Sequence, residues 1–395
     1  MFKCCRRILF LFLAVAALVS CGMGQVPGRR AVKYVEDILS DPESRIHSLV
    51  EGFDKRNNHA DIVLIDSPER CFILGEKMVS YDMHDNFDAS PAQDHLPDFS
   101  GERITSLVDI VFSPYDRFVS AGNHDALREV TAKAAVAALD TVCCLGPYDH
   151  EFKSRKPTAK LLVVSSPYMA AFGQFDVDTL FSAIGADVPV VCAAREAVEH
   201  VFSTHSGAVI MGFISDSLAM SSAVYGEVFR SVAESRHDPV SRCVQVPFDG
   251  SKDPLRAFLD GYSKSGVNAP LSAVVADDFS ICADSLRASL STLLGGSSEE
   301  SAFYRKLLAK DFEIVDCSEI VIEACYKIMR NRNLFTHNIS YPVADAFMTS
   351  PEENDYVLMD FDIASLPDPL ADILAATAPK TTRMYVQDQY YARGN

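Results

Sequence analysis

The sequence has 395 residues, of which 48% are hydrophobic and 23% are charged, and its formal net charge is −18. A chain of this length has room for two or three domains with substantial cores. Its acidity repels nucleic acid and anionic lipid headgroups, so we expect neither as a partner.

The chain begins with the pattern of an export signal, residues 1–20. A basic start is followed by an apolar run, residues 8–19, which is shorter than the roughly 20 residues that a membrane span needs. The run ends in LVSCG, which resembles the lipobox of bacterial lipoproteins. That resemblance implies cleavage before Cys21, a lipid on its thiol, and a lipid-anchored location in the cell envelope, at a periplasmic or outer-membrane face. The alternative is a simple signal peptide with a chance cysteine.

Two further segments precede the regular part of the chain. Residues 21–35 are rich in Gly, Pro, Arg and Lys, which predicts a flexible tether. Residues 36–104 are expected to be an N-terminal elaboration with a strand at 61–65, a helix near 68–78 and a polar loop at 82–100. No later segment is long and apolar enough to span a bilayer, so we expect a soluble body that is tethered through its lipid.

From residue 105 onward, short β-branched runs alternate with amphipathic helices, which is typical of parallel sheets covered by helices. The expected strands are 107–112, 160–166, 188–191, 207–214, 243–247, 271–276 and 312–316. The sequence therefore predicts an α/β fold of two lobes with Rossmann-like parallel sheets, lobe 1 at 105–205 and lobe 2 at 206–330. Residues 331–395 lose this pattern, and we expect them to cross back over the body.

The order of elements over about 107–290 resembles the type I periplasmic binding proteins and the sugar-binding part of LacI-type regulators. The segments that carry the resemblance are KLLVVSSP, ADVPVVCAARE, GAVIMGFISDS and LSAVVADDFS, in that order. The resemblance implies a binding protein that holds a small polar, sugar-like solute in the cleft between the lobes, with a transporter or sensor as a possible partner. The chain departs from the family at Asp277-Asp278, where the family has Asn-Asp, and it lacks or shortens one strand–helix unit at 143–159.

In open α/β sheets a ligand binds beyond the carboxyl ends of the strands, so the polar residues that follow each expected strand are the candidate ligand contacts. They are Ser113, Tyr115, Asp116, Ser166, Tyr168, Ser215, Asp249, Asp277 and Asp278. The structural alternative is that they cap helices, since Ser and Asp are favoured at N-caps. Capping is the better interpretation for Asp216, whereas two adjacent carboxylates at 277–278 exceed what one cap needs. The resemblance places the ligand-contacting aspartate at Asp278.

A metal-dependent hydrolase is one alternative. GNHD at 122–125 matches an element of the calcineurin-like metallophosphoesterases, and DMH at 82–84 matches their D-x-H. This interpretation would use Asp82, His84 and His124. The other two metal-binding elements of that family are missing, so we expect no metal, and no cofactor fingerprint is present either.

Two further alternatives remain open. Isomerases resembling the aspartate/glutamate racemases place one cysteine in each lobe, and Cys192 with Cys317 is the plausible pair here, although the usual companion motifs are missing. A surface interaction lipoprotein without a small ligand is the other alternative, and a cleft filled by its own side chains would support it.

The remaining cysteines suggest burial more than chemistry. Cys192, Cys243, Cys282 and Cys325 lie in apolar or helical patterns, where a cysteine behaves as a small hydrophobe. The adjacent pair at 143–144 is the best place for redox chemistry, but burial is expected there too. No Cys-x-x-Cys pair or Cys/His metal spacing is present in the sequence.

Overall fold

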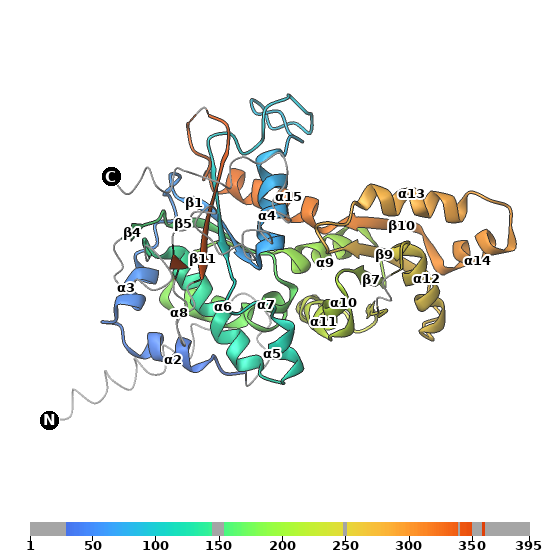
Figure 1. Cartoon of the computed structure of the whole chain (residues 1–395), viewed down its shortest axis with the longest axis horizontal. Helices are drawn as coiled ribbons and strands as arrows, with labels where there is room; N and C mark the ends of the chain where they lie inside the picture. The colour runs from blue at the N-terminus through green and yellow to red at the C-terminus, as the bar shows by residue number, and fades with distance from the viewer. Residues whose placement is uncertain (1–28, 144–153, 248–250, 339, 350–357, 360–395) are drawn as a thin grey trace, which may run out of the picture.

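The computed structural model describes residues 29–143, 154–247, 251–338, 340–349 and 358–359. Two sheets build two lobes, and helices lie against both (Figure 1). This confirms the predicted α/β fold of two lobes with parallel, Rossmann-like sheets. Within the described ranges, no helix is long and apolar enough to cross a membrane.

Lobe 1 is built on a six-stranded sheet with the order β12-β11-β2-β1-β5-β6. Its strands are β1 (Asp61–Asp66), β2 (Arg103–Val108), β5 (Ala159–Val164), β6 (Val190–Cys192), β11 (Val343–Thr349) and β12 (Leu358–Met359). The pairs are parallel except for β11 with β12. Every residue of β1 and β5 is buried, as expected for strands in the middle of a parallel sheet with both faces covered.

Lobe 2 is built on a four-stranded parallel sheet with the order β10-β9-β7-β8. Its strands are β7 (Ile210–Ile214), β8 (Arg242–Val244), β9 (Leu271–Ala276) and β10 (Leu308–Asp316). The two middle strands, β7 and β9, are buried along their whole length. A separate short pair joins β3 (Val142–Cys143) to β4 (Ser154–Arg155).

The helices follow the strands in chain order. Lobe 1 carries α2 (Lys33–Ser40), α3 (Arg45–Glu51), α4 (Pro68–Val79), α5 (Asp116–Ser120), α6 (His124–Leu139), α7 (Pro167–Phe172) and α8 (Gln174–Ile184). Lobe 2 carries α10 (Ser217–Ser221), α11 (Val224–Ser235), α12 (Pro254–Lys264), α13 (Ala283–Leu294) and α14 (Glu299–Leu307). Two helices connect the lobes, α9 (Ala193–Thr204) from β6 to β7 and α15 (Cys317–Asn331) from β10 to β11, and they pack against each other.

The segments at the two ends of the chain take a more central place than expected. The segment 36–104, expected as an elaboration, supplies β1 and the first residues of β2, and these two strands are the middle strands of the lobe 1 sheet. The segment that begins at residue 331 returns to lobe 1 and adds β11 in parallel beside β2. Sheet order therefore differs from chain order, and strand patterns alone do not specify it.

Candidate active site between the lobes

The carboxyl ends of strands from both lobes meet between the two sheets. Asp66 ends β1 and Ser165 directly follows β5, while Asp277 directly follows β9 in lobe 2. All three are at most 1% exposed. They are joined by Arg70 and by Tyr225, and we call these five residues the interlobe network.

Arg70 stands at the centre of this network. It lies in the first turn of α4, and its side chain is 14% exposed. Its Nε donates to Asp66 Oδ2 at 3.1 Å, and its Nη1 donates to the backbone oxygen of Asp277 at 2.5 Å. Its Nη2 donates to the backbone oxygen of Ser165 at 2.6 Å and to Asp277 Oδ1 at 3.1 Å. The guanidinium also lies 4.1 Å from the ring centroid of Phe279, so one cation ties the two lobes together.

Each lobe supplies a carboxylate with a hydroxyl partner. In lobe 1, Ser165 Oγ donates to Asp66 Oδ2 at 3.0 Å, and in lobe 2 the Tyr225 hydroxyl donates to Asp277 Oδ2 at 2.6 Å. Burial raises the pKa of Asp66 to about 6, although Arg70 opposes the shift. Burial tends to lower the pKa of Arg70, but the carboxylates of Asp277 and Asp66 outweigh it and hold the guanidinium charged. The result is two acid–base groups on either side of a fixed cation.

Ser113 and Tyr115, two of the expected ligand contacts, serve the loop after β2 instead. The Tyr115 hydroxyl donates to Asp109 Oδ2 at 2.9 Å, and the Ser113 hydroxyl donates to the backbone oxygen of Asp109. Thr349 Oγ1 donates to Asp109 Oδ1 at 3.0 Å, and Tyr115 is only 3% exposed. Both residues therefore hold this loop in place rather than line an open cleft.

The other expected contacts take different places in the structure. Ser166 has the predicted role of a helix cap, because it accepts the Met169 N–H at the start of α7. Asp278 instead accepts the N–H and the hydroxyl of Ser280 in a turn that precedes α13. Asp277 and Ser215 lie at the buried strand ends of lobe 2. Asp116, Tyr168 and Ser215 each have a buried oxygen without a hydrogen bond of normal geometry in the described part of the chain, although the Tyr168 hydroxyl interacts with Ser222 and that of Ser215 with Tyr225. Asp249 and Cys21 lie outside the described residues.

The proposed cysteine pair is buried in the closed structure, as the interlobe network is, and Cys317 contacts that network. Cys192 and Cys317 are at most 1% exposed, and burial is the main cause that raises the pKa of both thiols. The carboxylate of Asp178 raises the pKa of the Cys192 thiol further. Asp277, which interacts with the Cys317 thiol through a side-chain hydrogen bond, raises the pKa of that thiol further. A buried neutral thiol is a poor nucleophile or base, so these cysteines, like Asp66 and Asp277, could act only after the lobes part. Of the other thiols, Cys143 and Cys325 are buried and Cys243 is half-buried, but Cys282 was expected to be buried and is exposed, because it precedes α13 at its N-cap.

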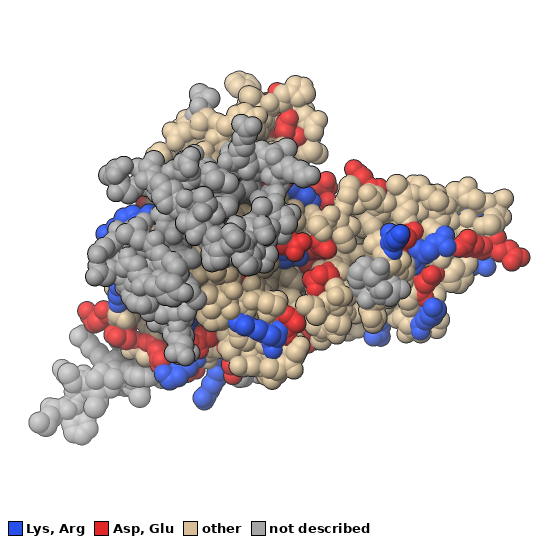
Figure 2. Space-filling view, in the orientation of Figure 1, with Lys and Arg blue, Asp and Glu red and all other residues tan. Residues whose placement is uncertain are grey.

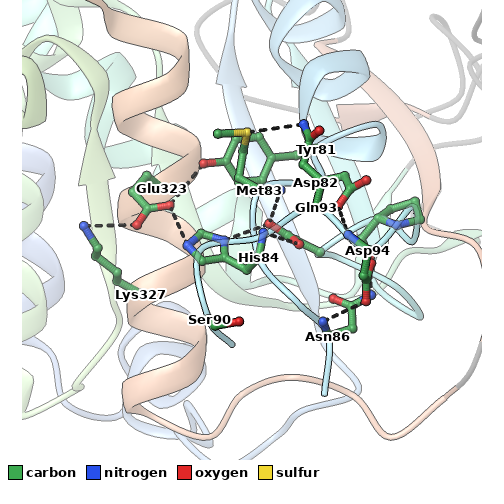
Figure 3. A network of polar contacts seen from close by, with 12 residues as sticks. Tyr81, Asp82, Met83, His84, Asn86, Ser90, Gln93, Asp94, Glu323 and Lys327 are labelled. Atoms are coloured by element: carbon green, nitrogen blue, oxygen red, sulfur yellow. Dashed lines mark hydrogen bonds and ion pairs between the residues drawn. The ribbon is translucent and has the colours of Figure 1, made fainter. Parts of the chain in front are cut away.

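The residues of the hydrolase hypothesis have other partners. Asp82 accepts the N–H groups of Asp94 and His95 within its loop. His84 lies between Asp98, at 2.9 Å, and Glu323, at 3.3 Å (Figure 3). His124 stacks on a phenylalanine ring at 4.4 Å. No group of three or more His, Cys, Asp or Glu residues in the described ranges could hold a metal ion.

Sequence reasoning missed Arg70, Asp66 and Tyr225. An arginine in the first turn of a helix has no distinguishing pattern, and a tyrosine at helical spacing indicates core packing. The available signal was the position of Asp66. It stands at the end of an apolar strand, just as Asp277 directly follows one.

No known protein family and no curated protein matches the sequence. Among solved structures, similar ones are glutamate racemases. That from Francisella tularensis, in complex with D-glutamate, is 11% identical with a TM-score of 0.45, and the match covers 81% of this chain and 94% of that one. That from Bacillus anthracis, isoform RacE1, is 14% identical with a TM-score of 0.42, covering 74% and 90%. That from Thermus thermophilus is 12% identical with a TM-score of 0.41, covering 85% and 99%.

These neighbours correct the expected resemblance. The prediction of a type I periplasmic binding protein or LacI-type domain is wrong, since the similar structures are racemases. The prediction of a solute-binding function is withdrawn with it. Both kinds of protein alternate strands and helices in two lobes, so the order of elements that carried the resemblance does not distinguish them. At these identities and TM-scores the similarity concerns the arrangement of elements and assigns no activity.

Proposed function

We propose that this chain is an enzyme that transfers a proton at a carbon atom of a small substrate held between the lobes, as an isomerase does. One observation carries the proposal: two acid–base groups, one from each lobe, flank a buried cation. Removing a proton on one face of a carbon and returning it on the other requires two such groups. The cation between them would stabilise the negative charge that develops on the substrate.

Each residue of the interlobe network has a role in this scheme. Asp66, with a pKa of about 6, is close to the neutral range in which a general base is most effective. Ser165 orients it through the 3.0 Å hydrogen bond. Asp277, held by Tyr225, acts from the opposite lobe. Because Arg70 fills the space between the two carboxylates, the lobes must part to admit the substrate.

The polar composition of the interlobe network indicates a functional role more than a stabilising one. A buried ion pair gains Coulomb attraction but loses the hydration of both charges. Well-packed apolar residues in its place often give the same stability or more. A buried carboxylate with a raised pKa at a strand end, as Asp66 is, is typical of a functional site. These properties support a catalytic centre here.

Deuterium exchange tests the proposal. The purified protein is incubated in D₂O with a panel of amino acids and hydroxy acids. Proton NMR then follows the loss of signal from the hydrogen on the carbon atom that carries the carboxylate. We expect exchange with at least one compound, and Asp66→Asn or Asp277→Asn should slow it about 100-fold or more. Asp41→Asn, at an exposed loop position, is the matched control. Absence of exchange from the whole panel, or full activity in both network variants, would refute the proposal.

A second function, binding of a protein partner without a small ligand, is favoured by a different observation. Arg70 already fills the space between the lobes, and Phe87 in the 80–102 loop is 97% exposed, as side chains at protein interfaces are before binding. This function predicts that no compound of the panel exchanges or changes the small-angle scattering profile. Scattering that shows the lobes parting with a substrate would contradict it.

Export and lipidation remain part of the proposal. The basic start, the short apolar run and Cys21 support a lipid anchor at the cell envelope. Mass spectrometry of the protein from a bacterial membrane fraction should find a diacylglyceryl group on Cys21, and Cys21→Ala should move the protein to the soluble fraction. An unmodified, unprocessed N-terminus would contradict the anchor.

A further inference from the structure

His84 attaches a long segment of lobe 1 to a helix that connects the two lobes. The segment 80–102 runs from α4 to β2, whereas α15 runs from β10 in lobe 2 to β11 in lobe 1. His84 Nδ1 lies 2.9 Å from Asp98 Oδ2 in the segment, and His84 Nε2 lies 3.3 Å from Glu323 Oε2 on α15 (Figure 3). The imidazole also stacks on the ring of Tyr326, with the centroids 4.0 Å apart. The ring therefore lies between two carboxylates and against one aromatic face.

The groups around the imidazole are shielded from water and have further contacts. The side chains of His84 and Asp98 are 12% and 0% exposed, and that of Glu323 is 26% exposed. Asp98 accepts two backbone N–H groups of the segment, at 3.1 and 3.2 Å. Glu323 accepts the Tyr81 hydroxyl at 3.1 Å and forms an ion pair with Lys327 Nζ at 3.1 Å. Both carboxylates therefore have partners that do not depend on the charge of the imidazole.

The segment itself is acidic. Residues 80–102 contain no Lys or Arg, and their other histidine, His95, is exposed. Acidic side chains show on the upper surface of the molecule, where this segment lies (Figure 2). Four further aspartates of the segment accept its own backbone N–H groups, namely Asp82, Asp85, Asp88 and Asp94. A charge attraction between the segment and Glu323 therefore requires a positive charge on His84.

Only the protonated imidazole attracts both carboxylates. An imidazolium has an N–H on each ring nitrogen and a positive charge, whereas a neutral imidazole has one N–H and one lone pair. In either neutral tautomer a lone pair faces a carboxylate, that of Glu323 or that of Asp98. Histidine side chains change their charge between about pH 5 and 8. The attachment is therefore complete at acidic pH and loses one of its two polar contacts as the pH rises.

We propose that His84 is a proton-controlled attachment point, which holds the segment 80–102 against α15 in its protonated form and loosens the segment in its neutral form. The loosening is local. Lys77 in the last turn of α4 donates to Ser318 in the first turn of α15 at 2.7 Å, and this contact does not involve His84. A change of pH therefore alters the mobility of the segment and leaves the junction of α4 with α15 in place. The attachment does not depend on the proposed proton-transfer reaction.

Hydrogen exchange of the full chain at pH 5.5 and at pH 8.5 tests the proposal. Each exchange rate is divided by the intrinsic rate at the same pH, which gives a protection factor. We expect protection in the segment 80–102 to fall about tenfold from pH 5.5 to pH 8.5, since one charge-assisted contact is lost. Protection in the first turn of α15 should stay within about twofold, because Lys77 still holds it.

Three variants assign the effect to His84. His84→Gln has no charge at either pH, so the segment should be about equally protected at both. Glu323→Gln removes the carboxylate on α15 and should reduce the pH dependence. His95→Asn is the matched control, because it changes the exposed histidine of the same segment, and asparagine tolerates the positive φ of 69° at that position. It should keep the pH dependence of the wild type.

The wild-type measurement alone can overturn the proposal, even if a variant does not fold. Equal protection of the segment at pH 5.5 and pH 8.5 would do so. A pH dependence that persists in His84→Gln, or that disappears in His95→Asn, would also overturn it. None of these outcomes changes the expected deuterium exchange at the interlobe network.

Discussion

Replacing Arg70 by methionine removes the cation that compensates two buried carboxylates while keeping a side chain of similar length. Asp66 and Asp277 are 1% and 0% exposed, and Arg70 makes an ion pair with each at 3.1 Å. Removing one partner of a buried ion pair costs about 3–5 kcal/mol, because the remaining charge is left without compensation. We expect a loss of that size in the free energy of unfolding at pH 8.

The loss should depend on pH in a defined direction. Burial has raised the folded-state pKa of Asp66 to about 6, above its unfolded value of 3.8, so its contribution to stability is present below pH 3.8 and is lost as the pH rises through about 6. Arg70 lowers the pKa of Asp66, so Arg70→Met shifts that pKa upward. The pH range in which the carboxyl stays protonated then extends to higher pH. The difference between variant and wild type should therefore be smaller at pH 5 than at pH 8.

Urea unfolding followed by circular dichroism at both pH values measures these differences. Arg230→Met is the control, since Arg230 pairs with two glutamates on α11 and its side chain is 57% exposed, where loss of a pair costs about 1 kcal/mol or less. Adding Asp66→Asn to Arg70→Met should recover part of the loss at pH 8. A loss below about 1 kcal/mol for Arg70→Met, or an equal loss at pH 5 and pH 8, would refute the argument that Arg70 compensates buried charge.

Three further predictions follow from other parts of lobe 1. Burial raises the pKa of Asp61 to about 7, so stability should fall as the pH rises through 7, and Asp61→Asn should flatten this dependence in urea titrations between pH 6 and pH 8; an unchanged slope would contradict it. His84→Gln should speed hydrogen exchange in the segment 80–102, because an amide cannot place one ring nitrogen against Asp98 and another against Glu323; unaltered exchange would show that these contacts do not hold the segment. Gly173→Ala should cost about 1–3 kcal/mol in urea unfolding, since a Cβ there would lie 2.2 Å from a hydroxyl of α6, whereas Gly226→Ala, inside α11 and with its nearest neighbour at 3.5 Å, should stabilise by about 0.5–1 kcal/mol; equal effects would contradict the packing argument.

The strands that the sequence specified best are those with unbroken apolar runs. The strand expected at 271–276 is β9 residue for residue, because a strand buried on both faces must be apolar throughout. The strand expected at 107–112 begins at Arg103 in the structure, because β2 contains Thr105 and Ser106, which are buried in the sheet but weaken the apolar pattern. Which strands become neighbours depends on contacts between distant segments, such as β11 beside β2, and no local pattern carries that information.

The candidate site was predictable where it depends on strand ends and unpredictable where it depends on a helix. Asp277 was expected from its place after β9, although the resemblance favoured Asp278, which the structure uses in a turn with Ser280. Arg70 could not be singled out, since its contacts with Ser165 and Asp277 arise only when the two lobes come together. The filled cleft is therefore a property of tertiary structure.

The distribution of Arg70's hydrogen bonds bears on how a closed centre could act as an enzyme. Two of its acceptors, Asp66 Oδ2 and the Ser165 oxygen, belong to lobe 1, and two belong to Asp277 of lobe 2. If the lobes part, Arg70 stays on lobe 1, where α4 carries it, and the donors on Nη1 and Nη2 that faced Asp277 become free. Two adjacent guanidinium donors match the two oxygens of a carboxylate. An opened centre would then present a carboxylate site on Arg70, so the interactions with Asp277 that fill the closed cleft are those that the carboxylate of a substrate would replace.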